Sequence, residues 1–226
     1  MGWLFALWNS TIGKKFVMAL TGLVLFGFVI GHMAGNLQIF AGPERINAYG
    51  KMLHDNAALL WATRAVLLAS VLLHILTSIQ LAARNRAARP VPYQARQWRE
   101  ASFASRFMMP AGLLVALFVA YHILHLTVGV AHPDRFRMLD GSRHAMDVHH
   151  NVVAGFSVWY ISLIYVAAQV MLGLHLSHGA WSMFQSLGIS HPRWTPLIKL
   201  GARGVAALVV LGNISIPLAV LAGVVK

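Results

Sequence analysis

Five apolar segments, each long enough to cross a lipid bilayer as a helix, set the fold class of this chain. They cover residues 16–40, 57–83, 107–131, 152–176 and 205–225 of its 226 residues. The apolar core of a bilayer needs about 20 apolar residues of helix. Only 11% of the residues are charged, against about 25% in a soluble domain. The sequence therefore predicts one all-α integral membrane domain, residues 1–226, with five transmembrane helices.

The net charge of +12 lies in the connecting segments. Basic residues gather before the first apolar segment, between the second and third, and between the fourth and fifth, whereas the other two connections are nearly neutral. The positive-inside rule then places the N-terminus and the basic connections in the cytoplasm. We expect contact with the lipid bilayer and no nucleic-acid binding. The basic residues are Lys14, Lys15, Arg84, Arg86, Arg89, Arg96, Arg99, Arg106, Arg193, Lys199 and Arg203.

Histidine is the unusual residue of the apolar segments. Four consecutive segments each carry one of His32, His74, His122 and His175. Ionisable residues inside a membrane are costly and indicate function. Successive helices run in opposite directions and rise about 1.5 Å per residue. His32 and His122 are therefore expected in the outer half of the membrane, and His74 and His175 in the inner half.

Two histidines at one depth on facing helices suit a six-coordinate haem iron, because each neutral ring gives the metal one nitrogen and donates its N–H to an acceptor nearby. The chain has no cysteine, so we expect two non-covalent b haems. Gly27, Gly31 and Gly35 on the first segment, and Gly173 and Gly179 on either side of His175, permit close approach of a macrocycle or a helix. A lone intramembrane histidine is often a packing residue, but four in two layers favour haem.

Two further histidines leave the choice of ligands open. His125 follows His122 by one helical turn, and His178 follows His175 in the same way. Either histidine of each couple has the chemistry of an iron ligand or of a partner for a haem propionate. The residues alone do not decide between them.

Short motifs over nearly the whole chain carry a resemblance to a known family. They are STIGKK (10–15), ALTG (19–22), GHMAGNL (31–37), LLHI (72–75), FVAYH (118–122), GLHLSHGAWS (173–182) and QSLG (185–188). The chain resembles the five-helix, two-haem cytochrome b anchor subunit of succinate:quinone oxidoreductase (complex II) and quinol:fumarate reductase. The segment 173–188 is the most specific match.

The resemblance implies a ligand set and partners. It implies that His74 and His175 hold the inner, proximal haem, and that His32 and His122 hold the outer, distal haem. It implies a flavoprotein subunit with FAD and an iron–sulfur subunit, which interconvert succinate and fumarate on the cytoplasmic face of a bacterial inner membrane. The anchor would exchange electrons with membrane quinone. Reaction direction, menaquinone or ubiquinone, and assembly into a higher oligomer stay open.

Five polar residues are candidates for quinone and propionate chemistry. Asp55 and His54, at the outer start of the second segment, are candidates for proton exchange with a quinone, and the alternative for Asp55 is a helix cap. Arg64 is a candidate ion-pair partner of a haem propionate. Ser10 and Lys14 form a pattern that resembles an alternative quinone site on the inner side of the membrane. A helix cap at Ser10 and a positive charge at Lys14 that sets the membrane topology explain these two residues better.

Three histidines lie just before the fourth segment. His144, His149 and His150 are interpreted as solvated loop histidines, because their spacing matches no strong zinc motif. The alternative function is the di-haem cytochrome b of another quinone-linked oxidoreductase, of the hydrogenase or formate dehydrogenase type. One histidine on each of the first four segments favours complex II, and an absorption spectrum would separate both from a haem-free transporter.

Overall fold

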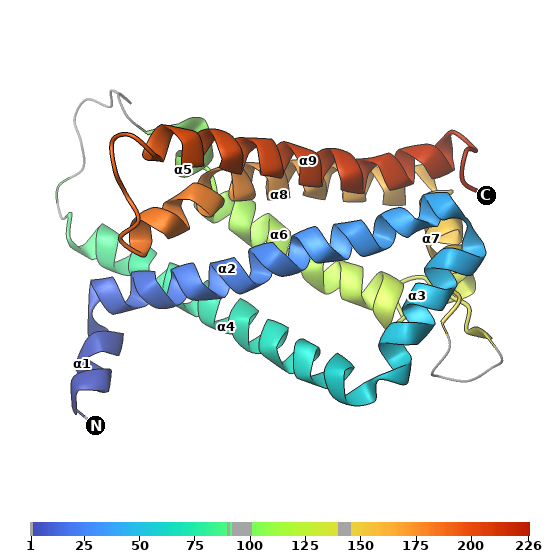
Figure 1. Ribbon diagram of the computed structural model, residues 1–226, viewed down its shortest axis with the longest axis horizontal. Coiled ribbons are helices and arrows are strands. Elements are labelled where there is room, and N and C mark those ends of the chain that lie inside the picture. Colours follow the sequence, from blue (N-terminus) through green and yellow to red (C-terminus); the bar gives the residue numbers. More distant parts are fainter. Residues whose placement is uncertain (1, 90, 92–100, 140–145) are drawn as a thin grey trace.

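Five long apolar helices dominate the computed structural model, which describes residues 2–89, 91, 101–139 and 146–226 (Figure 1). Each has the length and composition of a membrane span. The predicted class, an all-α multi-pass membrane protein with five candidate spans, is confirmed. The five helices are α2 (Thr11–Asn36), α4 (Ala57–Ala87), α6 (Met108–His122), α8 (Trp159–Ser186) and α9 (Thr195–Leu221).

Two spans continue beyond their α-helical part. A 3₁₀ turn, η1 (Leu37–Ala41), extends α2, and a π-helical turn, η2 (Ile123–Thr127), extends α6. The first span also begins earlier than predicted, at Thr11 rather than at residue 16, because Ser10 caps α2. The Ser10 hydroxyl accepts a hydrogen bond from the Gly13 N–H at 2.8 Å. Lys14 and Lys15 thus belong to the helix.

The fourth predicted segment, 152–176, divides into two helices. A short helix, α7 (Val148–Phe156), ends before Val158, whose backbone is extended, and α8 begins at Trp159. Hydropathy cannot reveal this break, because the residues on both sides of it are apolar. The span continues to Ser186, so His175 lies near the middle of α8 and not near the end of the span, as the predicted boundary at residue 176 implied.

Short helices lie at the two ends of the long ones. At one end, α1 (Gly2–Asn9) runs across the start of α2 and is tied to α4, because the Arg84 guanidinium donates a hydrogen bond to the Asn9 carbonyl at 2.7 Å (Figure 1). At the other end, α3 (Pro43–Asp55) joins η1 to α4. The remaining short elements are α5 (Phe103–Arg106) and η3 (Pro133–Arg135).

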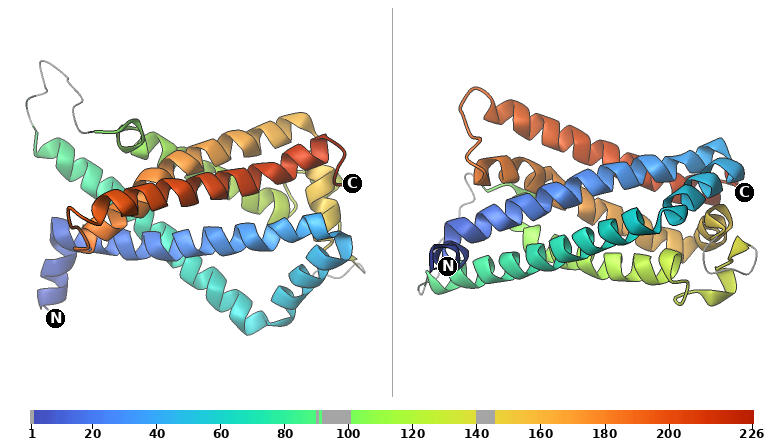
Figure 2. Two further views of the ribbon diagram at one scale, coloured as in Figure 1. Left: turned by 45° about the horizontal axis from the view of Figure 1, so that its top comes forward. Right: turned by 60° about the horizontal axis from the view of Figure 1, so that its bottom comes forward.

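The long helices pack unevenly. The most extensive contact is between α8 and α9, and α2 packs on α4, α8 and α9, whereas α6 packs on α8 (Figure 2). Helix α4 packs along α2 rather than along α6 or α8, and its far end diverges from α2 in Figure 1. A ligand held by both α4 and α8 must therefore be reached by their side chains, because the two helices do not pack closely on each other.

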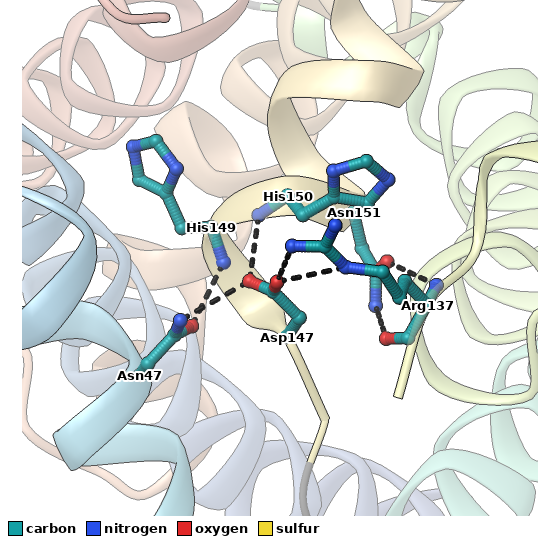
Figure 3. A network of polar contacts seen from close by, with 6 residues as sticks. All are labelled: Asn47, Arg137, Asp147, His149, His150 and Asn151. Carbon is teal, nitrogen blue, oxygen red and sulfur yellow. Dashed lines mark hydrogen bonds and ion pairs between the residues drawn. The ribbon is translucent and has the colours of Figure 1, made fainter. Parts of the chain in front are cut away.

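A polar network fixes the connections at the α3 end of the molecule (Figure 3). Asp147 caps α7 by accepting a hydrogen bond from the His150 N–H at 3.0 Å, and it also accepts from Asn47 at 3.1 Å and from the Arg137 guanidinium. Asn151 pairs with the backbone of Arg137 through both of its amide atoms. Burial would raise the pKa of Asp147, but these hydrogen bonds and the Arg137 charge hold that pKa below its ordinary value.

Candidate functional site

The structure brings His74 of α4 and His175 of α8 together. Their ring centroids lie 6.2 Å apart, and the ring planes are inclined by 61°. His74 belongs to a stripe of α4 that includes the buried residues Ser70, Thr77 and Leu81. His74 also contacts Met18 and Thr21 of α2, so the imidazole points into the bundle and not toward lipid. We call these two residues the His74–His175 pair.

A second pair forms between α2 and α6. The ring centroids of His32 and His122 lie 5.7 Å apart, with the planes at 88°. Phe28 stacks on His32 at 5.2 Å, and Phe118 lies 5.8 Å from His122. We call these two residues the His32–His122 pair. Each of four consecutive long helices thus contributes one ring to one of the two pairs.

Helices α2 and α6, which carry the His32–His122 pair, each have a glycine where they pass the His74–His175 pair. A Cβ atom on Gly22 of α2 would lie 3.3 Å from Cε1 of His74, and one on Gly112 of α6 would lie 3.3 Å from Cε1 of His175. Gly22 precedes His32 by ten residues, and Gly112 precedes His122 by ten. Ten residues of helix rise about 15 Å. The two pairs are therefore separated by about that distance along the helices.

The His74 ring is held from behind by α2. Its Nδ1 atom lies 3.2 Å from the Met18 carbonyl oxygen and 3.3 Å from the Thr21 hydroxyl. A carbonyl only accepts hydrogen bonds, so this contact favours the tautomer with the proton on Nδ1. The lone pair of Nε2 is then free for a ligand. Metal-bound histidines show this arrangement almost always.

The partner ring, His175, carries a buried polar atom in need of a partner. Its Nδ1 atom has no hydrogen bond of normal geometry within the described part of the chain, although the backbone of Met108 lies close enough to interact with the ring. A buried polar atom of this kind calls for an explanation such as a bound group.

The polar contacts of the other pair are less complete. The Asn36 side-chain amide lies 3.1 Å from Nε2 of His32, four residues away on the same helix. This contact must give way if His32 uses Nε2 for a ligand. On the other ring, Nδ1 of His122 lies 3.4 Å from the Tyr165 hydroxyl.

The residues present fit a haem at each pair. A metal–imidazole bond is about 2 Å long, so two rings on opposite sides of one iron have their centroids about 6 Å apart. The observed spacings are 6.2 and 5.7 Å. Around Gly27 and Gly31 of α2, which are exposed, a Cβ atom would meet nothing within 4 Å.

The two neighbouring histidines face elsewhere. His125 is buried, and its Nδ1 lies 2.9 Å from the Tyr165 hydroxyl, on the side of the ring that faces α8. His178 packs edge-on against Trp181 at 5.2 Å. Neither is among the ring contacts of His32 or His74 that the structure shows.

Asp55 and His54 lie apart from the histidine pairs. Asp55 is the last residue of α3 and forms an exposed ion pair with Lys51 at 2.8 Å. The cap of α4 is Asn56, which accepts a hydrogen bond from the Leu59 N–H at 3.1 Å, so Asp55 does not fill that role. His54 Nδ1 lies 2.8 Å from the Gly50 carbonyl. Asp55 lines an open hollow of about 490 Å³ at the corner between α3 and α4.

The remaining candidate cations are held by aromatic rings and amides. Arg64 lies on α4, with its guanidinium 5.0 Å from the Trp61 ring. Lys14 is buried, donates a hydrogen bond to the Gln80 side chain at 2.5 Å and lies 4.5 Å from the Trp8 ring. Ser10 is a helix cap, as the alternative interpretation proposed. The structure does not bring these cations together at one place.

The histidines that precede the fourth span differ in their surroundings. His149 is buried in α7, and its backbone N–H donates to the side-chain oxygen of Asn47 at 3.0 Å, so it differs from the solvated loop histidine that we expected (Figure 3). His150 donates its N–H to Asp147. His144 lies outside the described residues. Within the described ranges no group of three or more His, Asp or Glu side chains could hold a metal ion.

Sequence reasoning missed the groups that support the rings. Thr21 and Gly22 lie beside His74, Gly112 lies beside His175, and Tyr165 lies beside His122, whereas the Met18 contact uses only its backbone. Tyrosine inside an apolar segment was one available signal, because a buried phenol needs a hydrogen-bond partner.

Comparison with known protein families, curated proteins and solved structures gives no match to this chain. The arrangement of the two histidine pairs is therefore the basis for a proposal about function.

Proposed function

We propose that this protein is the di-haem cytochrome b anchor of a succinate:quinone oxidoreductase or quinol:fumarate reductase. In this role it carries electrons between cytoplasmic flavoprotein and iron–sulfur subunits and membrane quinone. One observation carries the proposal: four consecutive spans each present one histidine, and the four rings meet as two pairs with centroid spacings of 6.2 and 5.7 Å. The motifs quoted above add the resemblance to complex II.

Each protein group has a definite task in this proposal. His74 and His175 hold one haem, and His32 and His122 hold the other. The Met18 carbonyl orients His74 and keeps its proton on Nδ1. Gly22 and Gly112 keep the space beside the two inner rings free of side chains. Haem would supply a one-electron carrier at each level.

The geometry also favours one member of each couple of histidines. His122 faces His32, whereas His125 is engaged by Tyr165. His175 faces His74, whereas His178 packs on Trp181. We therefore propose His122 and His175 as ligands, with His125 as a supporting residue.

Quinone chemistry needs a source of protons. Asp55 and His54 stay our proposal for that exchange, supported by the open hollow of about 490 Å³ beside Asp55, a volume within the usual range for small-molecule sites. Ser10 and Lys14 stay the second location. The cap role of Ser10 and the contacts of Lys14 with Gln80 and Trp8 occupy both side chains, which favours the outer location. Arg64 stays a proposed partner of a haem propionate.

Haem content and co-purification test the proposal. The purified protein should show a b-type absorption band on reduction with dithionite and two haems per chain by pyridine haemochrome analysis. Flavin and iron–sulfur subunits should co-purify, and succinate should reduce the haems of the complex. A protein without haem would overturn the proposal. A di-haem protein that co-purifies with a hydrogenase or formate dehydrogenase subunit would establish the alternative function.

A further inference from the structure

The phenol of Tyr165 joins two histidines of α6 and η2. Its hydroxyl lies 2.9 Å from Nδ1 of His125 and 3.4 Å from Nδ1 of His122. The tyrosine ring is buried between Phe156, at 4.7 Å, and Phe118, at 5.0 Å, both edge-on. Aromatic packing on both sides fixes the position of the hydroxyl, so the two contacts are properties of a rigid part of the bundle.

His125 is held at Nδ1 by the Tyr165 hydroxyl, and its ring packs closely against Gly155. Its side chain is buried within η2, the π-helical turn that follows α6, and such turns occur frequently at functional sites. A Cβ atom on Gly155 would lie 2.8 Å from Nε2 of His125, so the ring fills the space that this glycine leaves. His125 is therefore a rigid partner for the Tyr165 hydroxyl.

The hydrogen bonds among Tyr165, His125 and His122 limit where their protons can lie. A phenol donates one hydrogen bond and accepts others through its oxygen. If the Tyr165 hydroxyl donates to His125, at the shorter distance, its oxygen accepts the Nδ1–H of His122. The proton of His122 is then on Nδ1, and the lone pair of Nε2 is available for a ligand.

We propose that Tyr165 is a positioning residue for His122: its oxygen accepts the Nδ1 proton of His122 and, with His125 fixing its own hydroxyl, holds the ring in the tautomer and orientation that a haem ligand needs. This inference rests on the proposed function, in which His122 is an iron ligand. It assigns a role to Tyr165 and His125 that the resemblance to complex II did not supply. The His74 ring is oriented by the backbone carbonyl of Met18, so a carbonyl positions His74 and a phenol positions His122.

A measurable asymmetry follows. An acceptor at Nδ1 raises the basicity of a ligating histidine and thereby favours the oxidised iron. Replacement of Tyr165 by phenylalanine keeps the aromatic packing and removes only the oxygen. The haem at the His32–His122 pair should then gain reduction potential and be held less tightly, whereas the haem at the His74–His175 pair should be unaffected.

The experiment compares Tyr165→Phe with Tyr160→Phe in the full protein. Tyr160 is on the same helix and is exposed, so it is a matched control for the loss of a phenol. Redox titration followed by absorption gives both midpoint potentials, which are assigned to the two sites with the His74→Ala variant. An excess of apomyoglobin measures haem retention. We expect a raised potential at one haem and a loss of affinity of about 10- to 100-fold there, with the second haem as the internal reference for folding.

The possible outcomes separate the inference from the proposed function. If Tyr165→Phe matches Tyr160→Phe at both haems, the role of Tyr165 is overturned while the di-haem proposal stands. If the wild-type protein holds no haem, the proposed function fails first. If Tyr165→Phe does not fold, His125→Phe decides: a shift confined to the same haem supports the inference, and unchanged potentials overturn it.

Discussion

The Nδ1 atom of His74 lies 3.2 Å from the carbonyl oxygen of Met18, across the contact between α4 and α2. The acceptor belongs to the backbone, so it depends on the packing of the two helices and not on the side chain at position 18. Thr21 adds its hydroxyl at 3.3 Å. The orientation of this ring is therefore insensitive to conservative substitution at Met18.

His74→Ala should remove one haem and largely spare the other, because the second pair draws its rings from α2 and α6. Pyridine haemochrome analysis should give half of the wild-type haem. His178→Ala is the matched control and should keep both haems, since its ring packs on Trp181. One haem per wild-type chain would contradict the assignment.

Gly112→Val should reduce haem at the His74–His175 pair. The new Cβ would lie 3.3 Å from the His175 ring, and the two methyl groups of valine extend further into that space. Gly204→Val is the control, because a Cβ at Gly204 of α9 meets nothing within 4 Å. The measurement is haem per chain together with the midpoint potentials. Equal haem content in the two variants would show that the glycine at position 112 is not required.

The orientation in the membrane is open to a labelling test. The chain lacks cysteine, so Arg89→Cys and Arg135→Cys each introduce a unique thiol. A membrane-impermeant reagent applied to intact cells should label position 135 and not position 89, because basic connections stay in the cytoplasm. Labelling of position 89 alone would reverse the topology.

Asp147→Asn should destabilise the protein by about 1–3 kcal/mol, because Asp147 caps α7 and accepts from Asn47 and Arg137. Since the pKa of Asp147 is lower in the folded protein than its ordinary 3.8, its contribution is complete above that value and is lost as the pH falls through the lower folded pKa. Thermal unfolding in detergent should show the wild type losing its advantage over the variant below about pH 4.

The control for this test is Asp134→Asn. Asp134 is exposed, and its distance of 3.5 Å to Arg135 is long for an ion pair. Its loss should change stability by less than about 0.5 kcal/mol. An equal effect of both variants would remove the special status of the Asp147 network.

Asp55→Asn should slow quinone-linked turnover by about a hundredfold if Asp55 exchanges protons with quinone. Both haems should stay bound, and succinate oxidation by an artificial dye acceptor should continue. Lys51→Met breaks the same ion pair at 2.8 Å without removing the carboxylate, so it should be nearly neutral. Wild-type turnover in Asp55→Asn would reduce the residue to a partner of Lys51.

Hydropathy and helix direction predicted five spans and the grouping of four histidines into two pairs, because both depend on one-dimensional patterns. The rings that the depth pattern grouped, His32 with His122 and His74 with His175, lie next to each other in the structure. The choice between His122 and His125 depends on the π-helical turn η2 and on Tyr165, neither of which a regular helical period shows. The break before Trp159 was equally hidden, since apolar residues flank it.

The ten-residue intervals between Gly22 and His32 and between Gly112 and His122 carry a constraint on chain length. Each helix serves one pair with its histidine and the other pair with its glycine. A single inserted residue would turn everything beyond it by about 100° and advance it by about 1.5 Å. One of the two contacts would then be lost. Within these intervals the sequence is free to vary in most of its side chains, but it is not free to gain or lose a residue.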